Sequence, residues 1–138
     1  MEISDTILND LAQNLEMGMQ TYIHKDTLEI FAIPTPEMLL DFEDYWKEDI
    51  KIFKKNKKKL IEIKPIPSHE SYKLMEKFVE LVDDKRIRGK LLTALGGRKP
   101  FAHFKNQVDY SGPYREMWFA FKNEQMMNWV RQQLKIKM

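Results

Sequence analysis

The spacing of apolar residues changes once along this chain, near Ser68, and that change most constrains the fold. Before it, residues 19–25, 28–33 and 60–64 are rich in strand-forming residues, which predicts three short strands. After it, apolar residues recur at intervals of three and four to the end of the chain, which predicts helices. Strands in one half and helices in the other are typical of an α+β fold.

A first helix is predicted to precede the strands. Apolar residues at helical spacing follow Ser4 and Asp5, either of which can cap the helix, and Gly18 lies where a helix-ending glycine is expected. Because a lone hairpin is only marginally stable, the three strands are expected to form one sheet. The predicted architecture is an N-terminal helix, a small three-stranded antiparallel sheet and a C-terminal helical array.

Four helices are predicted in the C-terminal array. Ser68 is expected to cap the first of them, and Asp83 or Asp84 the second. The last covers residues 114–135, either as one helix or as two pieces separated near Asn123. The order of the strands in the sheet does not follow from these patterns.

Residues 34–59 form a charge-polarised segment. Residues 37–49 carry six acids and one base, whereas residues 51–59 carry six lysines and no acid. One interpretation is an amphipathic helix, because an acidic start and a basic end suit the helix dipole. The other is a variable excursion between strands. No turn-rich stretch is long enough to divide the chain, so residues 1–138 are predicted to form a single domain.

Composition excludes several classes of chemistry. The 138 residues include no cysteine, which excludes disulfides, thiolate metal sites and a thiol nucleophile. The start of the chain lacks the pattern of a secretory signal, and no apolar run reaches the roughly 18 residues of a membrane span. We therefore expect a soluble cytoplasmic protein that does not enter a membrane. The net charge of +2 is too small to indicate a partner by itself.

Several short motifs lie in the second half of the chain: Arg98-Lys99-Pro100-Phe101, Phe104-Lys105, Pro113-Tyr114-Arg115 and Trp118-Phe119. Together these motifs resemble those of a known bacterial family of uncharacterised proteins, UPF series 0158. The resemblance covers nearly the whole chain apart from residues 34–59. It implies a protein with no assigned activity, and it transfers no catalytic residue, cofactor or substrate.

A basic stretch is the strongest functional signal. Residues 85–105 contain seven bases and no acid, and clustered Lys and Arg side chains can neutralise the phosphates of a nucleic acid. This pattern favours a non-catalytic binding module for an anionic partner, either nucleic acid or an acidic protein segment. The alternative is a solvated face, with some of the bases in structural ion pairs to Asp83, Asp84 or Glu116. The candidate anion-binding residues are Arg86, Arg88, Lys90, Arg98, Lys99, Lys105 and Arg115.

Two further interpretations stay open. The sequence has no P-loop, no GxSxG motif and no pair of histidines at metal-binding spacing, so no cofactor or metal is expected and a non-catalytic protein is favoured. A small hydrolase or transferase could still use His69, His103 or the acidic segment. Exposed Tyr45, Trp46 and Phe53 could instead form a surface for another protein or for a second copy of the chain.

Overall fold

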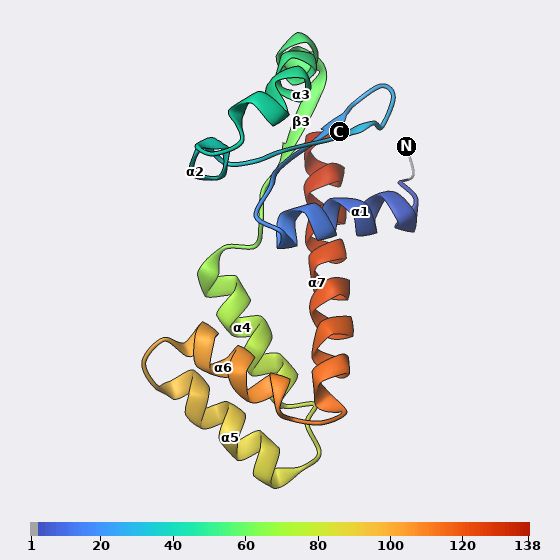
Figure 1. Cartoon of the computed structure of the whole chain (residues 1–138). Coiled ribbons are helices and arrows are strands. Elements are labelled where there is room, and N and C mark those ends of the chain that lie inside the picture. Colours follow the sequence, from blue (N-terminus) through green and yellow to red (C-terminus); the bar gives the residue numbers. More distant parts are fainter. Residues whose placement is uncertain (1–2) are drawn as a thin grey trace. The chain divides into compact units, whose positions relative to one another are not determined.

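The computed structural model describes residues 3–138 of the chain (Figure 1). Its residues group into two compact units. Unit 1 combines residues 3–65 with residues 126–138, and unit 2 comprises residues 66–125. The predicted α+β class is confirmed, since the described residues are 67% helical and include a three-stranded antiparallel sheet. The single-domain organisation stays a prediction.

Unit 1 contains the sheet and the helices of the N-terminal half (Figure 1). Its elements are α1 (Asp5–Glu16), β1 (Gln20–His24), β2 (Ile30–Ile33), α2 (Pro36–Leu39), α3 (Glu43–Asn56), the 3₁₀ turn η1 (Lys57–Lys59), β3 (Leu60–Ile63) and, from residue 126, the last part of α7 (Tyr114–Lys137). The three expected strands and the first helix are confirmed. Ser4 caps α1, because its hydroxyl oxygen accepts a hydrogen bond from the Ile7 amide at 3.3 Å.

The sheet is antiparallel throughout and has the order β2-β1-β3, so β1 is the central strand. Tyr22 of β1 lies opposite Phe31 on one side and Glu62 on the other. Alternate residues of the sheet enter the core of unit 1, where Ile23 and Ile63 pack with α1 and α7. The buried members of this core are Leu8, Leu11, Leu15, Ile23, Ile63, Val130 and Leu134.

Side chains of α7 cover the outer edge of β3 and the residue that follows it. The Lys64 carbonyl accepts hydrogen bonds from Trp129 Nε1 at 2.9 Å and from Gln133 Nε2 at 2.7 Å. The Lys64 amide donates to Gln133 Oε1 at 2.9 Å, and Lys137 Nζ donates to the Glu62 carbonyl at 2.9 Å. Side chains therefore pair the Glu62 carbonyl and both backbone groups of Lys64, which lie at the end of this edge strand.

The charge-polarised segment is helical. It forms α2, α3 and η1, with Glu43 and Asp44 in the first turn of α3 and Lys54 and Lys55 in the last. This order of charges suits the helix dipole, and it favours the helical interpretation over an irregular excursion. No residue of α3 is buried, however, so α3 depends less on the core than the other long helices do.

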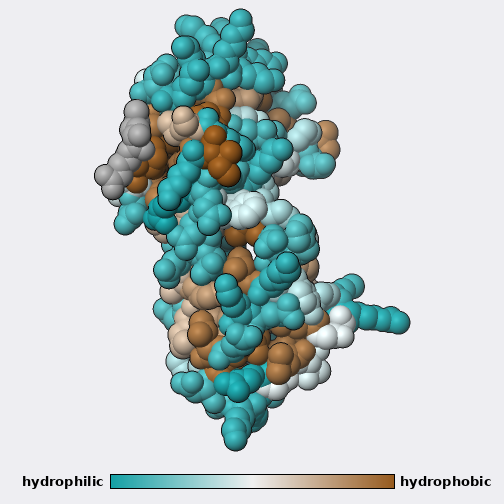
Figure 2. Space-filling model, turned by 180° about the vertical axis from the view of Figure 1, so that it is seen from behind, coloured by the Kyte–Doolittle hydropathy of each residue, from teal (hydrophilic) through white to brown (hydrophobic). Residues whose placement is uncertain are grey.

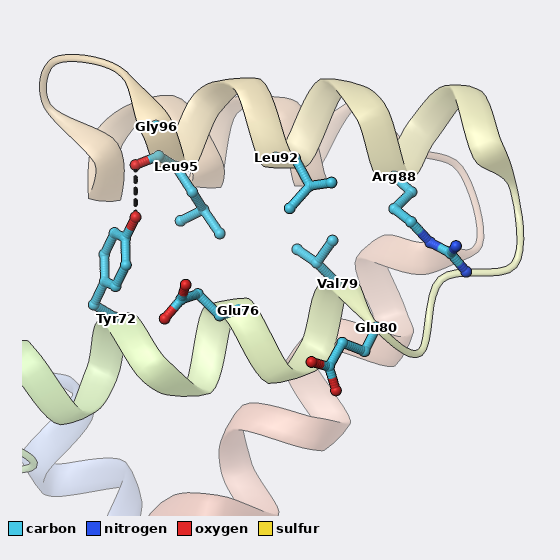
Figure 3. Close-up of a pocket in the computed structure, with 8 residues that line it drawn as sticks. All are labelled: Tyr72, Glu76, Val79, Glu80, Arg88, Leu92, Leu95 and Gly96. Atoms are coloured by element: carbon cyan, nitrogen blue, oxygen red, sulfur yellow. Dashed lines mark hydrogen bonds between the residues drawn. The ribbon is translucent and has the colours of Figure 1, made fainter.

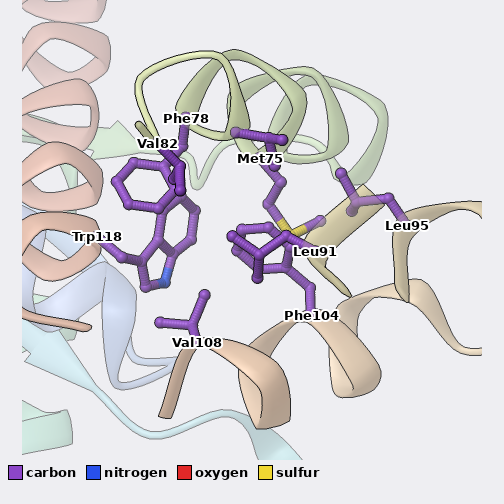
Figure 4. Packing of buried hydrophobic residues seen from close by; sticks show 9 residues of the cluster. Met75, Phe78, Val82, Leu91, Leu95, Phe104, Val108 and Trp118 are labelled. Atoms are coloured by element: carbon purple, nitrogen blue, oxygen red, sulfur yellow. The ribbon is translucent and has the colours of Figure 1, made fainter. Parts of the chain in front are cut away.

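Unit 2 is entirely helical. It contains α4 (Ser68–Val79), α5 (Lys85–Gly96), α6 (Pro100–Asp109) and the first part of α7. Figure 4 shows how these four helices direct apolar side chains into one core. The ring of Trp118 is at its centre, with ring centroids 5.0 Å from Phe104 and 5.2 Å from Phe78, both in edge-on contacts that are favourable for aromatic pairs.

The helix boundaries correct one detail of the sequence interpretation and decide two that it left open. Ser68 does not cap α4: it is the first helical residue, and Pro67 occupies the capping position without a side-chain hydrogen bond. The second helix of the array, α5, is capped by Asp84. The last helix is continuous through Asn123.

The face of the molecule shown in Figure 2 is mainly hydrophilic, with smaller apolar areas among the hydrophilic residues. Within residues 3–138, no helix is both long enough and apolar enough to cross a membrane.

Candidate functional site

The basic residues of α5 lie on its solvent side because its apolar residues face the core. Leu91, Ala94 and Leu95 are the buried residues of this helix. Asp84 starts it by accepting hydrogen bonds at Oδ1 from the amides of Arg86 (2.9 Å) and Ile87 (3.0 Å). The helix then begins with Lys85 and Arg86, both exposed.

Three of the bases line one shallow depression, which we call the α5 basic face: Lys85, Arg86 and Lys90. The depression has a volume of about 520 Å³, and Gly89, Thr93 and Gln107 of α6 complete its lining. Arg86 and Lys90 are four residues apart, as are Gly89 and Thr93, so both pairs follow one side of the helix. The lining contains no carboxylate and no apolar side chain.

The electrostatics of the α5 basic face are unfavourable to the isolated helix. Cations in the first turn oppose the helix dipole, whose amino end is already positive. None of the ion pairs within residues 3–138 involves Lys85, Arg86 or Lys90. Positive charge is thus concentrated at this surface without an internal partner, and an external anion would relieve it.

Arg88 lies on another side of α5 and is engaged with the backbone. Its Nε and Nη2 atoms donate to the Val82 carbonyl at 2.9 and 2.5 Å. It also lines a second depression of about 470 Å³ between α4 and α5, whose lining includes Glu76 of α4 and Glu80, the residue that follows α4 (Figure 3). Tyr72 closes one end, where its hydroxyl donates to the Leu95 carbonyl at 2.9 Å. Two carboxylates make this depression unsuited to a polyanion.

Arg115 is paired within unit 2. Its Nε lies 3.4 Å from Asp109 Oδ1, and its guanidinium group lies 4.7 Å from the centroid of the Phe119 ring. An ion pair of this kind was one alternative for Arg115, but the partner is Asp109 and none of the expected acids. Tyr114 is also engaged, because its hydroxyl oxygen accepts a hydrogen bond from the Asp84 amide at 3.3 Å.

The remaining candidates are exposed but separated along α6. Arg98 and Lys99 precede this ten-residue helix, which is about 15 Å long, whereas Arg115 follows it. These residues therefore do not converge on one site. Lys105 is two positions from Gln107, which places it about 200° around α6 from the depression. Lys99 has a left-handed backbone conformation with φ of 47°.

The histidines have separate local environments. His24 Nδ1 accepts hydrogen bonds from the amides of Asp26 and Thr27 and so stabilises the turn after β1. His69 Nε2 lies 3.5 Å from Glu70 Oε1 at the exposed start of α4, and His103 is exposed on α6. None of the three lines either depression beside α5. The hydrolase alternative stays a prediction.

The candidate residues predicted from the sequence omitted four residues of the depression: Lys85, Gly89, Thr93 and Gln107. A signal for Gly89 and Thr93 was present, because residues 86, 89, 90 and 93 follow the helical spacing of three and four. The contribution of Gln107 required the packing of α6 against α5. The same spacing rule separates Arg88 from Arg86, since two positions correspond to about 200° around a helix.

The model of an uncharacterised protein family, UPF0158, matches residues 3–137. The chain belongs to this family. The resemblance noted in the sequence motifs is therefore confirmed, and UPF0158 membership brings no specific activity with it.

A UPF0158 relative from Pseudomonas aeruginosa, named UPF0158 protein PA5073, is 29% identical over 72 residues. That match covers 52% of this chain and 47% of the relative, so it spans about half the length of the curated protein. No solved structure matches the chain significantly.

Proposed function

We propose that this UPF0158 protein is a non-catalytic nucleic-acid-binding module that contacts the phosphate backbone through the α5 basic face. One observation carries the proposal: Lys85, Arg86 and Lys90 line a single depression without a carboxylate. Lysine and arginine bind phosphates by charge and by hydrogen bonds, and the release of counterions drives the association.

The lining of the depression favours a nucleic acid over an acidic protein segment. Protein interfaces depend on buried apolar and aromatic anchors, and this depression offers none. The Thr93 hydroxyl and the Gln107 amide supply instead the neutral hydrogen-bonding groups that commonly contact phosphate and sugar. Arg98 and Lys99, exposed in the loop after α5, extend the proposed surface.

Three of the candidate residues are not part of the surface that we propose, two because of their internal contacts and one because of its position on α6. Arg88 is bonded to the Val82 carbonyl, and Arg115 is paired with Asp109. Lys105 is on a different side of α6 from the depression. A cytoplasmic location is part of the same proposal, and the cysteine-free composition fits a reducing compartment.

Fluorescence anisotropy with labelled RNA and DNA, single- and double-stranded, tests the proposal across a salt series. For duplex DNA, three phosphate contacts predict a slope of log Kobs against log salt of about −3. The double substitution Arg86→Ala/Lys90→Ala should weaken binding and make this slope shallower by about 2. No binding of any of the four probes at low salt would contradict the proposal.

The matched control is Lys54→Ala/Lys58→Ala, which removes the same charge from exposed residues of α3 and η1. It should leave the salt slope unchanged. If both double variants weaken binding equally, attraction is spread over the protein and the α5 basic face is not the site. A labelled polyglutamate peptide that binds more tightly than all nucleic acids at equal salt would favour the acidic-protein alternative.

A further inference from the structure

The helix α3 is anchored on one side only. Trp46, Ile50 and Phe53 are half-buried toward the sheet, and the ring centroids of Phe53 and Tyr22 are 4.7 Å apart. Trp46 and Phe53 are thus not the fully exposed residues that the sequence suggested. Beside this anchored side, Tyr45 is 77% exposed, and Ile52, which lines a depression of about 230 Å³ together with residues of β2, is 49% exposed. These two residues are seven positions apart and form an apolar stripe that the rest of the protein covers only in part.

Charges flank this apolar stripe in a defined order. Asp44, Glu48, Lys51 and Lys55 are spaced by four, three and four positions, so they share one side of α3 next to Tyr45 and Ile52. Two acids are followed by two bases. None of the ion pairs within residues 3–138 involves these four side chains.

Within a single helix the order of charges suits the dipole, but like charges also lie at a spacing of four. Asp44 and Glu48 form one such pair and Lys51 and Lys55 another, and such neighbours repel each other. Between two antiparallel copies, the same order places each acid opposite a base. The arrangement is self-complementary, which is the requirement for a contact with two-fold symmetry.

We propose that two copies of this chain associate through α3, arranged antiparallel about a two-fold axis near residues 49 and 50. Glu48 faces Lys51 of the second copy, and Asp44 faces Lys55 of the second copy. Tyr45 and Ile52 pack between the two helices across the axis. A nucleic acid would be repelled by the acidic half of α3 and a basic peptide by the lysine half, so a second copy is the partner that satisfies both.

Charge reversal tests the geometry on the full chain by sedimentation or light scattering over a concentration series. Glu48→Lys alone and Lys51→Glu alone each replace two attractive contacts by two repulsive ones, and each should raise the dimer dissociation constant at least about tenfold. An equimolar mixture of the two variants should form a heterodimer, and the double variant Glu48→Lys/Lys51→Glu should dimerise like the original chain.

The control is Glu124→Lys, an exposed residue of α7 in unit 2 with the same change of charge. It should leave dimerisation unchanged. Ile52→Asp should abolish the dimer, with circular dichroism showing that the helical content is retained. A chain that stays monomeric at every concentration up to 1 mM overturns the association. A dimer whose dissociation constant is unchanged by the charge reversals overturns the antiparallel pairing through α3.

Discussion

Two helices of this protein are strongly charged, and they differ in how they are held and in how their charge is ordered. α5 buries Leu91, Ala94 and Leu95, and its charged residues are all bases. α3 buries no residue, and its charge changes sign halfway along its length. A firmly held helix with one sign of charge fits an oppositely charged polymer. A loosely held helix with opposed halves fits a copy of itself turned end to end.

Truncation of one apolar residue in each helix gives the largest effect and tests the difference in anchoring. Leu91→Ala in α5 removes a fully buried side chain and should lower the free energy of unfolding by about 3 kcal/mol. Ile50→Ala in α3 removes a half-buried one and should cost about 1 kcal/mol. Denaturant titrations measure both, and equal losses would show that α3 is anchored as firmly as α5.

The two helices also start differently. Asp84 caps α5 through two hydrogen bonds, whereas Phe42 at the start of α3 offers no side-chain cap. Asp84→Ala should therefore destabilise the protein by about 1 kcal/mol. Asp84→Asn keeps an acceptor oxygen and should lose less than half of that in the same chemical denaturation experiment. If the two variants lose the same amount, the capping hydrogen bonds do not account for the effect.

Gly89 allows stability and binding to be separated in α5. A Cβ atom added there meets no atom within 4 Å apart from its chain neighbours and the nearby backbone of α5 itself, and alanine is favoured over glycine inside a helix. Gly89→Ala should raise the free energy of unfolding by about 0.5–1 kcal/mol. The added methyl group projects toward the depression of the α5 basic face, so the affinity for nucleic acid should fall while stability rises. Gly96→Ala, another position with open space, is the control for binding.

The smallest expected effect is on the pH dependence of stability, and it concerns Tyr22, whose ring contacts that of Phe53 in α3. Burial raises the pKa of the Tyr22 hydroxyl above its usual value of 10.0, and the neighbouring Glu62 carboxylate raises it further. Because the folded state holds this proton more tightly than the unfolded state, stability is fully present below pH 10 and declines as the pH rises through the folded pKa. Tyr22→Phe should flatten this decline in unfolding titrations above pH 10, and an unchanged pH profile would contradict the shift.

Local patterns predicted much of the fold. The strands, the caps at Ser4 and Asp84 and the four C-terminal helices all follow from residue preferences and apolar spacing, which act over a few residues. The strand order could not be predicted, because either edge of the β1–β2 hairpin could have accepted β3. The cap of α4 was misassigned to Ser68, since the helix begins one residue earlier than a serine cap requires.

The candidate site was harder to predict than the fold. Counting bases in residues 85–105 identified the region, but the count could not show that Arg88 turns toward the Val82 carbonyl. Likewise, the partner of Arg115 depends on how α6 and α7 meet, and sequence proximity pointed to other acids. Charge composition finds a basic segment, whereas the packing of neighbouring helices decides which of its members face solvent.

The side chains of Trp129, Gln133 and Lys137 that occupy the backbone groups of Glu62 and Lys64 have a further consequence. A sheet open on both sides can add strands indefinitely and grow into a fibre. Here an incoming strand would have to displace three side chains of α7 to pair at this end of β3. That displacement carries an energetic cost, which guards this part of the sheet against edge-to-edge aggregation.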